Sequence, residues 1–579
     1  MRRGVDQRIR RLFDDRLLWL TLGLTAFAWA ALLSPGYFFR AHDARHSVFF
    51  LLEFDAAIRD GAWWPRWTMD QALGYGYPLW LFYSPLSYYV AEAFHLLGLG
   101  FTAAVKATYL VGFLAAAWAM YALVRRWWGR PAAMVAALAY TYAPYHLVDI
   151  YVRSALAEFM AFVWFPLTLL TFDALVSRGG RRNLAWAALT FAGLTLTHSV
   201  TALVFTPLLA AAVLWDLLRL HWRNRERLLA RAGSALAAAL LGIGVGAIFL
   251  VPMILERPYI VQEQWMHGTY QYQQHFIYLF QFLSPLWDFL YSVEGPGDGM
   301  PFQLGAVITV LALGASVVAW LRPDRDRGRI LFLVGATLVL LFMMTGAARP
   351  LWDAISPIQL VQFPWRLLAP VAVTLAILTG ASIVILPTTD ANATSTVAAL
   401  LLVLASLPYT VPQFTPVTPE DESALAIYRF EREYPDMVGM TAWAQEPPKN
   451  SPLWEQVKQG RPIDQLDRMR VMSGRGEVET TRIGGASVEG RVRAQEPITV
   501  QFFTYWFPGW QARVDGKKVD SYPSGKYGLL AIDVPAGEHT VSIRMGGTPA
   551  RNAGAVISGI SLLLIGAIAL LPRRRREGT

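Results

Sequence analysis

The chain has 579 residues, of which 55% are hydrophobic and only 16% are charged, whereas about a quarter of the residues of a soluble domain are charged. This composition excludes an ordinary soluble domain and predicts a polytopic membrane protein. The net charge of +9 comes from basic residues between apolar segments and at both chain ends, as membrane orientation requires, so we expect no nucleic-acid partner. The absence of cysteine excludes disulfides, thiolate metal sites and cysteine nucleophiles.

A membrane-spanning helix needs about 20 predominantly apolar residues. By this criterion the sequence predicts twelve spans, and the arginines before the first of them indicate a signal anchor rather than a cleaved signal peptide. The spans lie near residues 17–35, 101–124, 131–148, 155–176, 183–198, 201–219, 233–255, 303–321, 329–346, 365–386, 396–410 and 553–571.

Residues 78–97 are apolar enough to cross the membrane, but they contain two prolines and Glu92. If this segment does not cross, the basic stretches all lie on the side of the basic N-terminus; if it crosses, all of them change sides. Because basic loops favour the cytoplasmic side, we predict a juxtamembrane or re-entrant helix at 78–97 and cytoplasmic N and C termini. The basic stretches are 125–130, 177–182, 219–231, 322–329 and 573–576.

Three segments are then predicted on the outer side of the membrane: 36–100, 256–302 and 412–551. Residues 412–470, rich in proline and charge, indicate an irregular connector. The following residues alternate as strands do, with turn signals at Asp515-Gly516 and Ala536-Gly537, which predicts an extracytoplasmic β-sandwich or half-barrel. The expected fold is therefore an all-α polytopic membrane protein of about twelve spans with a C-terminal β-sandwich-like domain. Its parts are a transmembrane domain (1–411), the connector with the β-domain (412–551), and a last span with a basic cytoplasmic tail (552–579).

The first external segment begins with two histidines and an aspartate within five residues, His42, Asp43 and His46. Asp43 could accept the proton of an attacking hydroxyl group as a general base. The three side chains together could also bind a divalent cation such as Mg²⁺ or Mn²⁺. The alternative is a polar loop that caps a helix at the interface, and the spacing alone does not decide between these hypotheses.

Further polar and aromatic side chains are expected on the same side of the membrane. Ionisable groups at membrane depth are costly and indicate function by default, and arginine beside aromatic rings suits a phosphorylated headgroup and a stacked sugar. The alternatives are helix caps, an aromatic belt at the interface, and arginines that snorkel to water. The predicted substrate-binding residues are Trp64, Arg66, Tyr75, His146, Asp149, Arg153, Glu158, Trp365 and Arg366.

Several motifs carry a family resemblance that covers residues 36–571. "HDARH", "GAWWPRW", "LGYGYPLWLFYSPLSYY", "YAPYHLVDIYVRSALAE" and "LVQFPWR" together resemble the bacterial multi-pass membrane family named 6-pyruvoyl-tetrahydropterin synthase related. "FTYWFPGWQARVDGKKV" and the final span resemble the tail of YfhO-type membrane proteins. Both families are similar to the C-type (GT-C) glycosyltransferase superfamily, whose polytopic enzymes take a sugar from a polyprenyl-phosphate donor. There an acidic residue of the first external loop activates the acceptor, a role that the resemblance implies for Asp43. The superfamily often has two adjacent acidic residues, whereas here His42 precedes Asp43.

The resemblance thus predicts an inverting glycosyltransferase on the outer face of a bacterial plasma membrane. His42 and His46 would orient Asp43 or bind the cation, and Arg153 and Arg366 would stabilise the departing lipid phosphate. The partners it implies are membrane lipids, a polyprenyl-phosphate sugar donor, and a cell-envelope glycan, lipid or protein as acceptor, which the β-domain would hold or screen. The alternative is a non-enzymatic transporter, flippase or scaffold for envelope lipids or polysaccharides. Transporters usually show inverted repeats and paired broken helices. The sequence has one broken helix and no clear internal repeat, which counts against that alternative.

Overall fold

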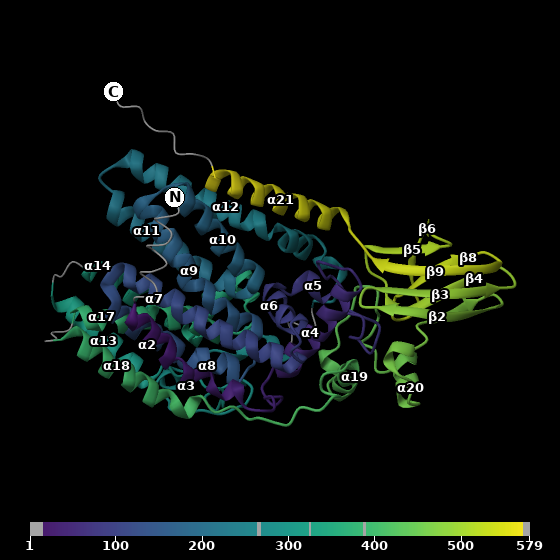
Figure 1. Ribbon diagram of the computed structural model, residues 1–579, viewed down its shortest axis with the longest axis horizontal. Coiled ribbons are helices and arrows are strands. Elements are labelled where there is room, and N and C mark those ends of the chain that lie inside the picture. The colour runs from purple at the N-terminus through teal and green to yellow at the C-terminus, as the bar shows by residue number, and fades with distance from the viewer. Residues whose placement is uncertain (1–14, 263–267, 323–325, 386–389, 571–579) are drawn as a thin grey trace.

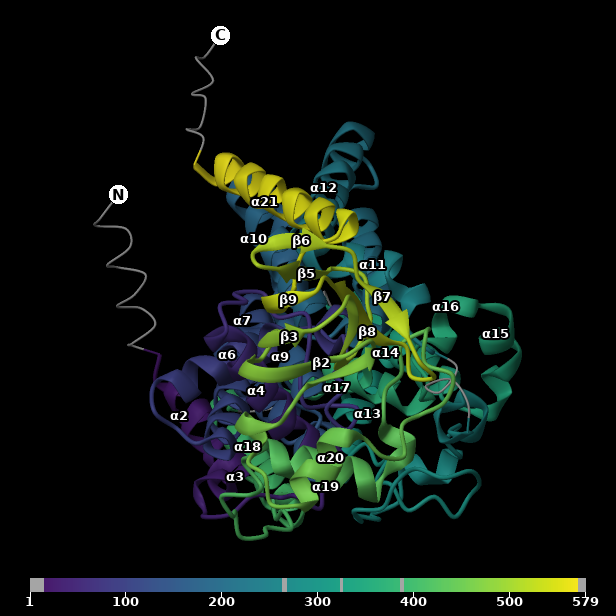
Figure 2. The ribbon, with the colours of Figure 1, turned by 90° about the vertical axis from the view of Figure 1, so that its right-hand side faces the viewer.

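The computed structural model describes residues 15–262, 268–322, 326–385 and 390–570. A bundle of helices makes up most of the structure, and a β-domain stands at one end of it (Figure 1). The view from that end shows the two sheets in front of the bundle (Figure 2). The predicted helical membrane architecture with a C-terminal β-domain is confirmed. The basic N-terminal stretch and the basic tail 573–576, on which the predicted orientation partly depends, lie outside the described residues.

The apolar stretches form helices because a helix satisfies its backbone hydrogen bonds within one segment, which a lipid environment requires. Among the described residues, eight helices are long and apolar enough to cross a membrane, or nine if a bent pair after residue 326 is one span. The count of twelve spans stays a prediction. The bundle consists of α2 (Arg16–Leu24), α3 (Ala26–Trp29), η1 (Ala30–Leu33), α7 (Phe101–Thr141), α8 (Pro144–Tyr151), α9 (Leu156–Arg178), α10 (Arg181–Thr197), α11 (Ser199–His221), α12 (Arg225–Leu255), α13 (Ala306–Leu321), α14 (Arg327–Met343), η8 (Pro364–Leu367), α17 (Leu368–Ile385), α18 (Ala391–Ser406) and α21 (Pro549–Leu570).

Two predicted spans, 101–124 and 131–148, lie mostly within α7, which is broken at Gly129, where φ is 83°. A glycine tolerates this left-handed conformation, and Pro131 follows it directly. At the centre of the bundle, α17 is apolar on all sides and almost wholly buried, as a helix without a polar face should be.

The external segments fold into short helices near the β-domain (Figure 1). In the doubtful segment 78–97, the longest helix has only 11 residues, too few to cross a bilayer, which agrees with the predicted juxtamembrane position. The short elements are α4 (Ala44–Arg59), α5 (Leu79–Phe82), α6 (Leu86–Leu96), η2 (Arg257–Tyr259), η4 (Gly268–Tyr270), η5 (Tyr272–Gln274), η6 (Leu279–Phe282), η7 (Gly346–Ala348), α15 (Arg349–Ala354), α16 (Ser356–Gln359) and η9 (Leu407–Tyr409).

The connector is more ordered than its composition predicted. It contains α19 (Ala424–Glu433), η10 (Pro435–Met437), α20 (Pro452–Lys458) and η11 (Ile463–Gln465). Helix α19 is strongly amphipathic, and its buried side packs on the first external segment, so the expectation of an irregular connector was wrong there.

The β-domain has two antiparallel sheets, with strand orders β1-β4-β8-β7 and β2-β3-β9-β5-β6. Apolar side chains of both sheets share one core, as in a sandwich, and Trp67 of the first external segment joins this core. The predicted turn Asp515-Gly516 joins β5 to β6, with φ of 49° and 76°. The strands are β1 (Met469–Ser473), β2 (Gly476–Gly484), β3 (Ser487–Ala494), β4 (Ile498–Tyr505), β5 (Trp510–Val514), β6 (Lys517–Val519), β7 (Tyr522–Ser524), β8 (Leu529–Val534) and β9 (Gly537–Met545).

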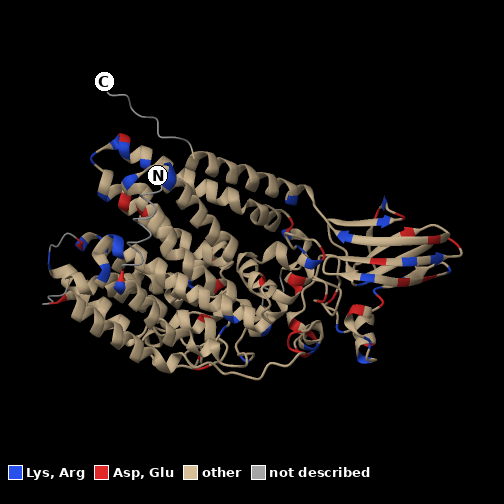
Figure 3. Cartoon of the chain, in the orientation of Figure 1, with Lys and Arg blue, Asp and Glu red and all other residues tan. Residues whose placement is uncertain are grey.

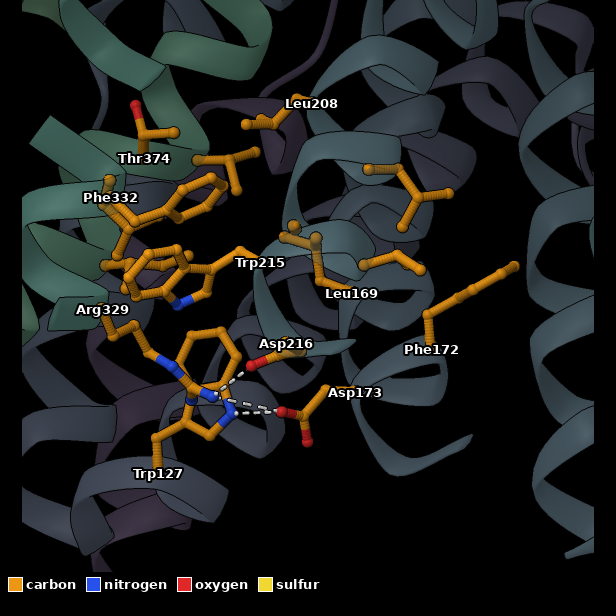
Figure 4. Close-up of a pocket in the computed structure, with 16 residues that line it drawn as sticks. Trp127, Leu169, Phe172, Asp173, Leu208, Trp215, Asp216, Arg329, Phe332 and Thr374 are labelled. Atoms are coloured by element: carbon orange, nitrogen blue, oxygen red, sulfur yellow. Dashed lines mark hydrogen bonds and ion pairs between the residues drawn. The ribbon is translucent and has the colours of Figure 1, made fainter. Parts of the chain in front are cut away.

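Lys and Arg residues gather at the end of the bundle away from the β-domain, which we call the basic end (Figure 3). There Arg329 stacks on the ring of Trp127 at 3.9 Å and lies 3.3 Å from Asp173 and 3.2 Å from Asp216 (Figure 4). These contacts tie α7, α9, α11 and α14 together. The adjoining cavity measures about 30 Å³, which holds no more than one or two water molecules. This cluster is therefore a structural connection and not a substrate site.

Candidate functional site

A much larger cavity, of about 420 Å³, lies at the other end of the bundle. Its wall comes from α4, the loop between α8 and α9, the segment before α17, and the connector helix α19. A cavity of this size matches the usual range for small-molecule sites. Its polar lining consists of Asp43, His46, Ser47, Gln71, Arg153, Ser154, Glu158, His198, Gln362, Arg366 and Glu431, together with tyrosines 77, 83, 88 and 270.

Backbone hydrogen bonds bring residues 43 and 153 together although 110 residues separate them. The amide of His42 donates to the carbonyl of Val152 at 3.1 Å, and the amide of Asp43 donates to the carbonyl of Arg153 at 2.7 Å. The hydroxyl of Ser47 donates to the carbonyl of Ser154 at 3.0 Å. The start of α4 is thus fixed to the loop that carries Arg153.

Asp43 occupies the N-cap position of α4, yet its side chain makes no capping hydrogen bond. Within the described ranges its carboxylate takes part in no hydrogen bond or ion pair, and it lines the cavity half-buried. The alternative of an ordinary helix cap therefore does not describe this residue. Its carboxylate has free acceptor capacity where a ligand in the cavity can reach it.

The two histidines beside Asp43 lie differently. The ring of His42 stacks on Tyr291 with 4.0 Å between centroids, and its Nε2 lies 3.3 Å from the carbonyl oxygen of Phe289, so it packs against the second external segment. His46 lines the cavity and meets the ring of Phe430 edge-on at 4.9 Å. Burial lowers the pKa of both histidines, which keeps them neutral at neutral pH.

The sequence also predicted a divalent-cation site at His42, Asp43 and His46. No three His, Asp or Glu side chains of the described ranges are grouped closely enough to hold a metal ion. His42, Asp43 and His46 do not form such a ligand set in this structure, so we assign no step to a metal. The divalent cation stays a prediction from the sequence.

Arg153 is buried in a dense set of partners. Its Nη1 donates to the carboxylate of Asp149 and to the hydroxyl of Tyr145 at 3.1 Å, and it forms an ion pair with Glu158 Oε2 at 2.9 Å. Its guanidinium also lies 4.6 Å from the ring centroid of Trp365. Asp149 and Trp365 contact Arg153 but do not line the cavity. Two carboxylates already balance the charge of this arginine.

Among the described residues, Arg366 pairs with one carboxylate, whereas Arg153 pairs with two. Its Nη1 donates to the carbonyl of Val361 at 2.8 Å and to Gln362 Oε1 at 3.2 Å, while its Nε lies 3.6 Å from Glu158 Oε2. No acceptor among the described residues takes a hydrogen bond from that Nε, although it is buried. A guanidinium has five N–H donors, so Arg366 has donors to spare for an anion in the cavity.

Other predicted binding residues lie away from the cavity. His146 sits in the aromatic core, stacked on Phe162 at 4.2 Å, with its Nδ1 3.0 Å from the carbonyl oxygen of Tyr140. Tyr75 packs between Tyr505 and Tyr527, in the contact between the first external segment and the β-domain. The structure therefore gives these two residues packing roles and does not bring them to Asp43.

Trp64 and Arg66 also lie outside the cavity. Arg66 Nη2 donates to the carbonyl of Ile248 near the end of α12 at 3.0 Å, and its guanidinium lies 5.6 Å from the ring centroid of Trp64. These contacts anchor the tryptophan-rich turn on the bundle.

Glu431, from α19, is a cavity residue that the sequence did not point to. Its carboxylate accepts hydrogen bonds from the amides of Ala72 at 2.8 Å and Leu73 at 2.6 Å. Both residues have φ of 54°, an unfavourable conformation for L-residues with side chains, and these bonds hold them in it. Burial raises the pKa of Glu431 to about 7. The connector thereby fixes the loop that places Gln71 in the cavity wall.

Solved structures of low similarity include three kinds of membrane glycosyltransferase. Arabinofuranosyltransferase AftD from Mycobacteria is 15% identical with a TM-score of 0.46, and the match covers 70% of this chain and 27% of that one. The oligosaccharyltransferase of Archaeoglobus fulgidus is 12% identical with a TM-score of 0.41, covering 75% and 60%. Arabinosyltransferase EmbB from Mycobacterium smegmatis is 11% identical with a TM-score of 0.35, covering 92% and 63%. This chain spans less than two thirds of each of these proteins, and scores at this level assign it no activity.

No curated protein matches the chain. A protein-family model does match residues 80–417, more than half of the chain, and its description is "6-pyruvoyl-tetrahydropterin synthase related domain; membrane protein". The matched range includes the motifs around Arg153 and Arg366, and it ends at the start of the connector. The resemblance to this family is confirmed over residues 80–417.

Proposed function

The chain belongs to the 6-pyruvoyl-tetrahydropterin synthase related family of membrane proteins, and we propose that it is a glycosyltransferase that uses a polyprenyl-phosphate sugar donor. One observation carries the proposal. The carboxylate of Asp43, which has no hydrogen-bond partner among the described residues, and the guanidinium of Arg366, which has an unused N–H donor, line the same cavity. A general base for a hydroxyl group and a cation for a departing phosphate are the two groups that this reaction needs.

In this proposal an acceptor hydroxyl of the cell envelope gives its proton to Asp43 while its oxygen attacks the anomeric carbon of the donor sugar. A new carbon–oxygen bond forms as the bond between the anomeric carbon and the phosphate oxygen breaks. The polyprenyl phosphate leaves with the electron pair, and attack from the opposite side inverts the anomeric configuration. His46, one helical turn after Asp43 in α4 and neutral, adds no positive charge that would weaken the base.

The two arginines have different roles in this proposal. Arg366 binds the phosphate as negative charge develops on it, because it has donors without acceptors. Arg153 is already paired with Asp149 and Glu158, so it holds the cavity wall and orients Glu158 toward Arg366. The sequence prediction gave both arginines the same role.

The proposed location is a bacterial plasma membrane with the cavity facing outward. Basic residues favour the cytoplasmic side of a membrane, and they gather at the end of the bundle away from the β-domain (Figure 3). The cavity lies at the opposite end, where α19 forms part of its wall and would help to hold or screen an acceptor.

We expect Arg366→Gln to lower kcat/KM for the lipid-linked donor by about 10–100-fold, since a hydrogen bond to a charged group contributes about 1.5–3 kcal/mol. The measurement is release of polyprenyl phosphate by purified protein in vesicles, with a panel of polyprenyl-phosphate sugars and an envelope glycan fraction as acceptor. Arg349→Gln, which removes an exposed arginine of α15, is the matched control and should leave the rate unchanged. Equal rates for Arg366→Gln and the control would refute the phosphate-binding role.

A further inference from the structure

The second external segment carries an unusually apolar surface between Tyr278 and Val293. Asp288 is the only charged residue in this stretch, and its carboxylate accepts a hydrogen bond from the amide of Phe289 at 2.7 Å. The large apolar side chains exposed here are Tyr278, Leu279, Phe280, Leu283, Leu286, Leu290, Tyr291 and Val293, and Leu279 and Leu283 are 72% and 73% exposed. A loop in water does not normally show such a contiguous apolar surface.

The segment lies against the ends of lipid-facing helices. The amide of Ile277 donates to the carbonyl of Met344, just after α14, at 2.8 Å, and the amide of Leu304, just before α13, donates to the carbonyl of Phe282 at 3.0 Å. Trp287 packs on Tyr409, just after α18, with 4.8 Å between ring centroids. The segment is thus fixed at the β-domain ends of three bundle helices.

Those same helices expose apolar side chains along their length. The exposed residues are Val310, Leu313 and Val317 on α13, Leu338, Val339 and Phe342 on α14, and Leu400, Leu401 and Leu404 on α18. In a membrane protein such residues face lipid hydrocarbon. The short helices α15 and α16, at the right of Figure 2, continue this surface with exposed Leu351 and Ile355. The apolar surface of the segment therefore continues the lipid-facing surface of the bundle.

The segment also lies close to the cavity, whose lining includes Asp43 but no residue of the segment itself. Tyr291 stacks on His42, and its hydroxyl donates to the carbonyl of His42 at 3.4 Å. His42 directly precedes Asp43 in the chain. A lipid chain that lies on Leu290 and Tyr291 would therefore have its polar end beside the carboxylate of Asp43.

We propose that the segment Tyr278–Val293 lies in the outer part of the bilayer, contacts lipid hydrocarbon, and receives the isoprenoid chain of the donor beside His42. The contact with lipid is inferred from the exposed apolar surface alone. The identification of the lipid chain as the isoprenoid of the donor rests on the proposed function. In this position Asp288 lies at the interface between the bilayer and water, at the same level as the polar end of the lipid. Its carboxylate accepts a hydrogen bond from a backbone amide.

The absence of cysteine makes a direct test simple, because each single-cysteine variant carries one spin label. Leu283→Cys and Leu290→Cys are labelled in the full-length protein in vesicles of zwitterionic and anionic phospholipid. Leu338→Cys on α14 is the lipid-facing control, and Met472→Cys on β1, 44% exposed, is the aqueous control. The readout is the collision rate of each label with dissolved oxygen, which concentrates in hydrocarbon, and with a water-soluble nickel chelate.

We expect the oxygen-to-nickel ratio at positions 283 and 290 to be several-fold higher than at 472 and to approach the ratio at 338. A ratio equal to that at 472 would overturn the lipid contact. Addition of a polyprenyl phosphate should then immobilise the label at 290 but leave the label at 338 unchanged, and inorganic phosphate should affect neither. No response at 290 would overturn the donor path, whatever the outcome of the transfer assay.

Discussion

Replacing Asp43 by asparagine is expected to lower the rate of glycosyl transfer by about 10²–10⁴-fold, the usual contribution of a general base. The amide keeps the size and most of the polarity of the side chain but does not take up the proton of the acceptor hydroxyl. Because the carboxylate makes no capping hydrogen bond in α4, its loss should change the folding free energy little. The effect should therefore appear in kcat and not in the amount of folded protein.

The measurement is single-turnover transfer from a polyprenyl-phosphate sugar, with the thermal unfolding midpoint followed in parallel. Asp520→Asn, an exposed aspartate in the β-domain, is the matched control and should behave like the unmodified protein. Asp43→Glu should keep part of the activity, because it retains a carboxylate at the cavity wall. Full transfer by Asp43→Asn would remove this residue from the mechanism.

Arg153→Gln is expected to destabilise the protein by about 3–5 kcal/mol, because it leaves the buried carboxylate of Asp149 without its cation and Glu158 with Arg366 alone. Asp149 is inaccessible to solvent and does not line the cavity, so water cannot replace the lost cation there. The free energy of unfolding in detergent, from denaturant titration, gives the size of the effect.

A second substitution separates the loss of charge pairing from the loss of packing. In the Arg153→Gln background, Asp149→Asn removes the unpaired charge of Asp149 and should recover part of the stability. Arg349→Gln, an exposed arginine near the same end of the bundle, should change the unfolding free energy little. If Arg153→Gln also left the unfolding free energy unchanged, the ion-pair account of this residue would be wrong.

The sequence predicted a shared site for Asp43, Arg153 and Arg366 for a physical reason. Each of them lies at the outer edge of an apolar segment, and the distribution of basic residues placed those edges on one side of the membrane. The structure brings all three to one cavity. The sequence could not distinguish the two arginines, because the ion pairs of Arg153 with Asp149 and Glu158 depend on the geometry of the α8–α9 loop.

Other features could not be predicted, because side-chain direction and long-range packing are not local properties of the sequence. His146 follows directly after Tyr145, which bonds Glu158, but its ring points into the aromatic core beside Phe113 and Phe162. Glu431 lies in a connector whose proline and charge content predicted no regular structure, although the stretch 424–433 has the spacing of an amphipathic helix. Recognition of that spacing would have predicted α19, but not its contact with Ala72, 359 residues away.

The number and bounds of the spans could not be predicted fully from the sequence, because they depend on backbone geometry. A sequence window cannot tell that the predicted loop at 125–130 is reduced to a kink at Gly129 within α7, or that the first span is divided among α2, α3 and η1. The strands after residue 486 were easier to predict, since alternation and turn residues are both local signals.

The most direct test of the central claim is the position of a lipid phosphate in an experimental structure of the full chain with a polyprenyl phosphate bound. The account predicts phosphate density within hydrogen-bond distance of the guanidinium of Arg366, on the cavity side, with the isoprenoid chain leaving past His42 and Tyr291. The space between the phosphate and the carboxylate of Asp43 should then have room for one sugar ring. Phosphate density in another cavity, or the chain bound with its phosphate facing away from Asp43, would contradict the single-site account and favour a carrier of envelope lipids.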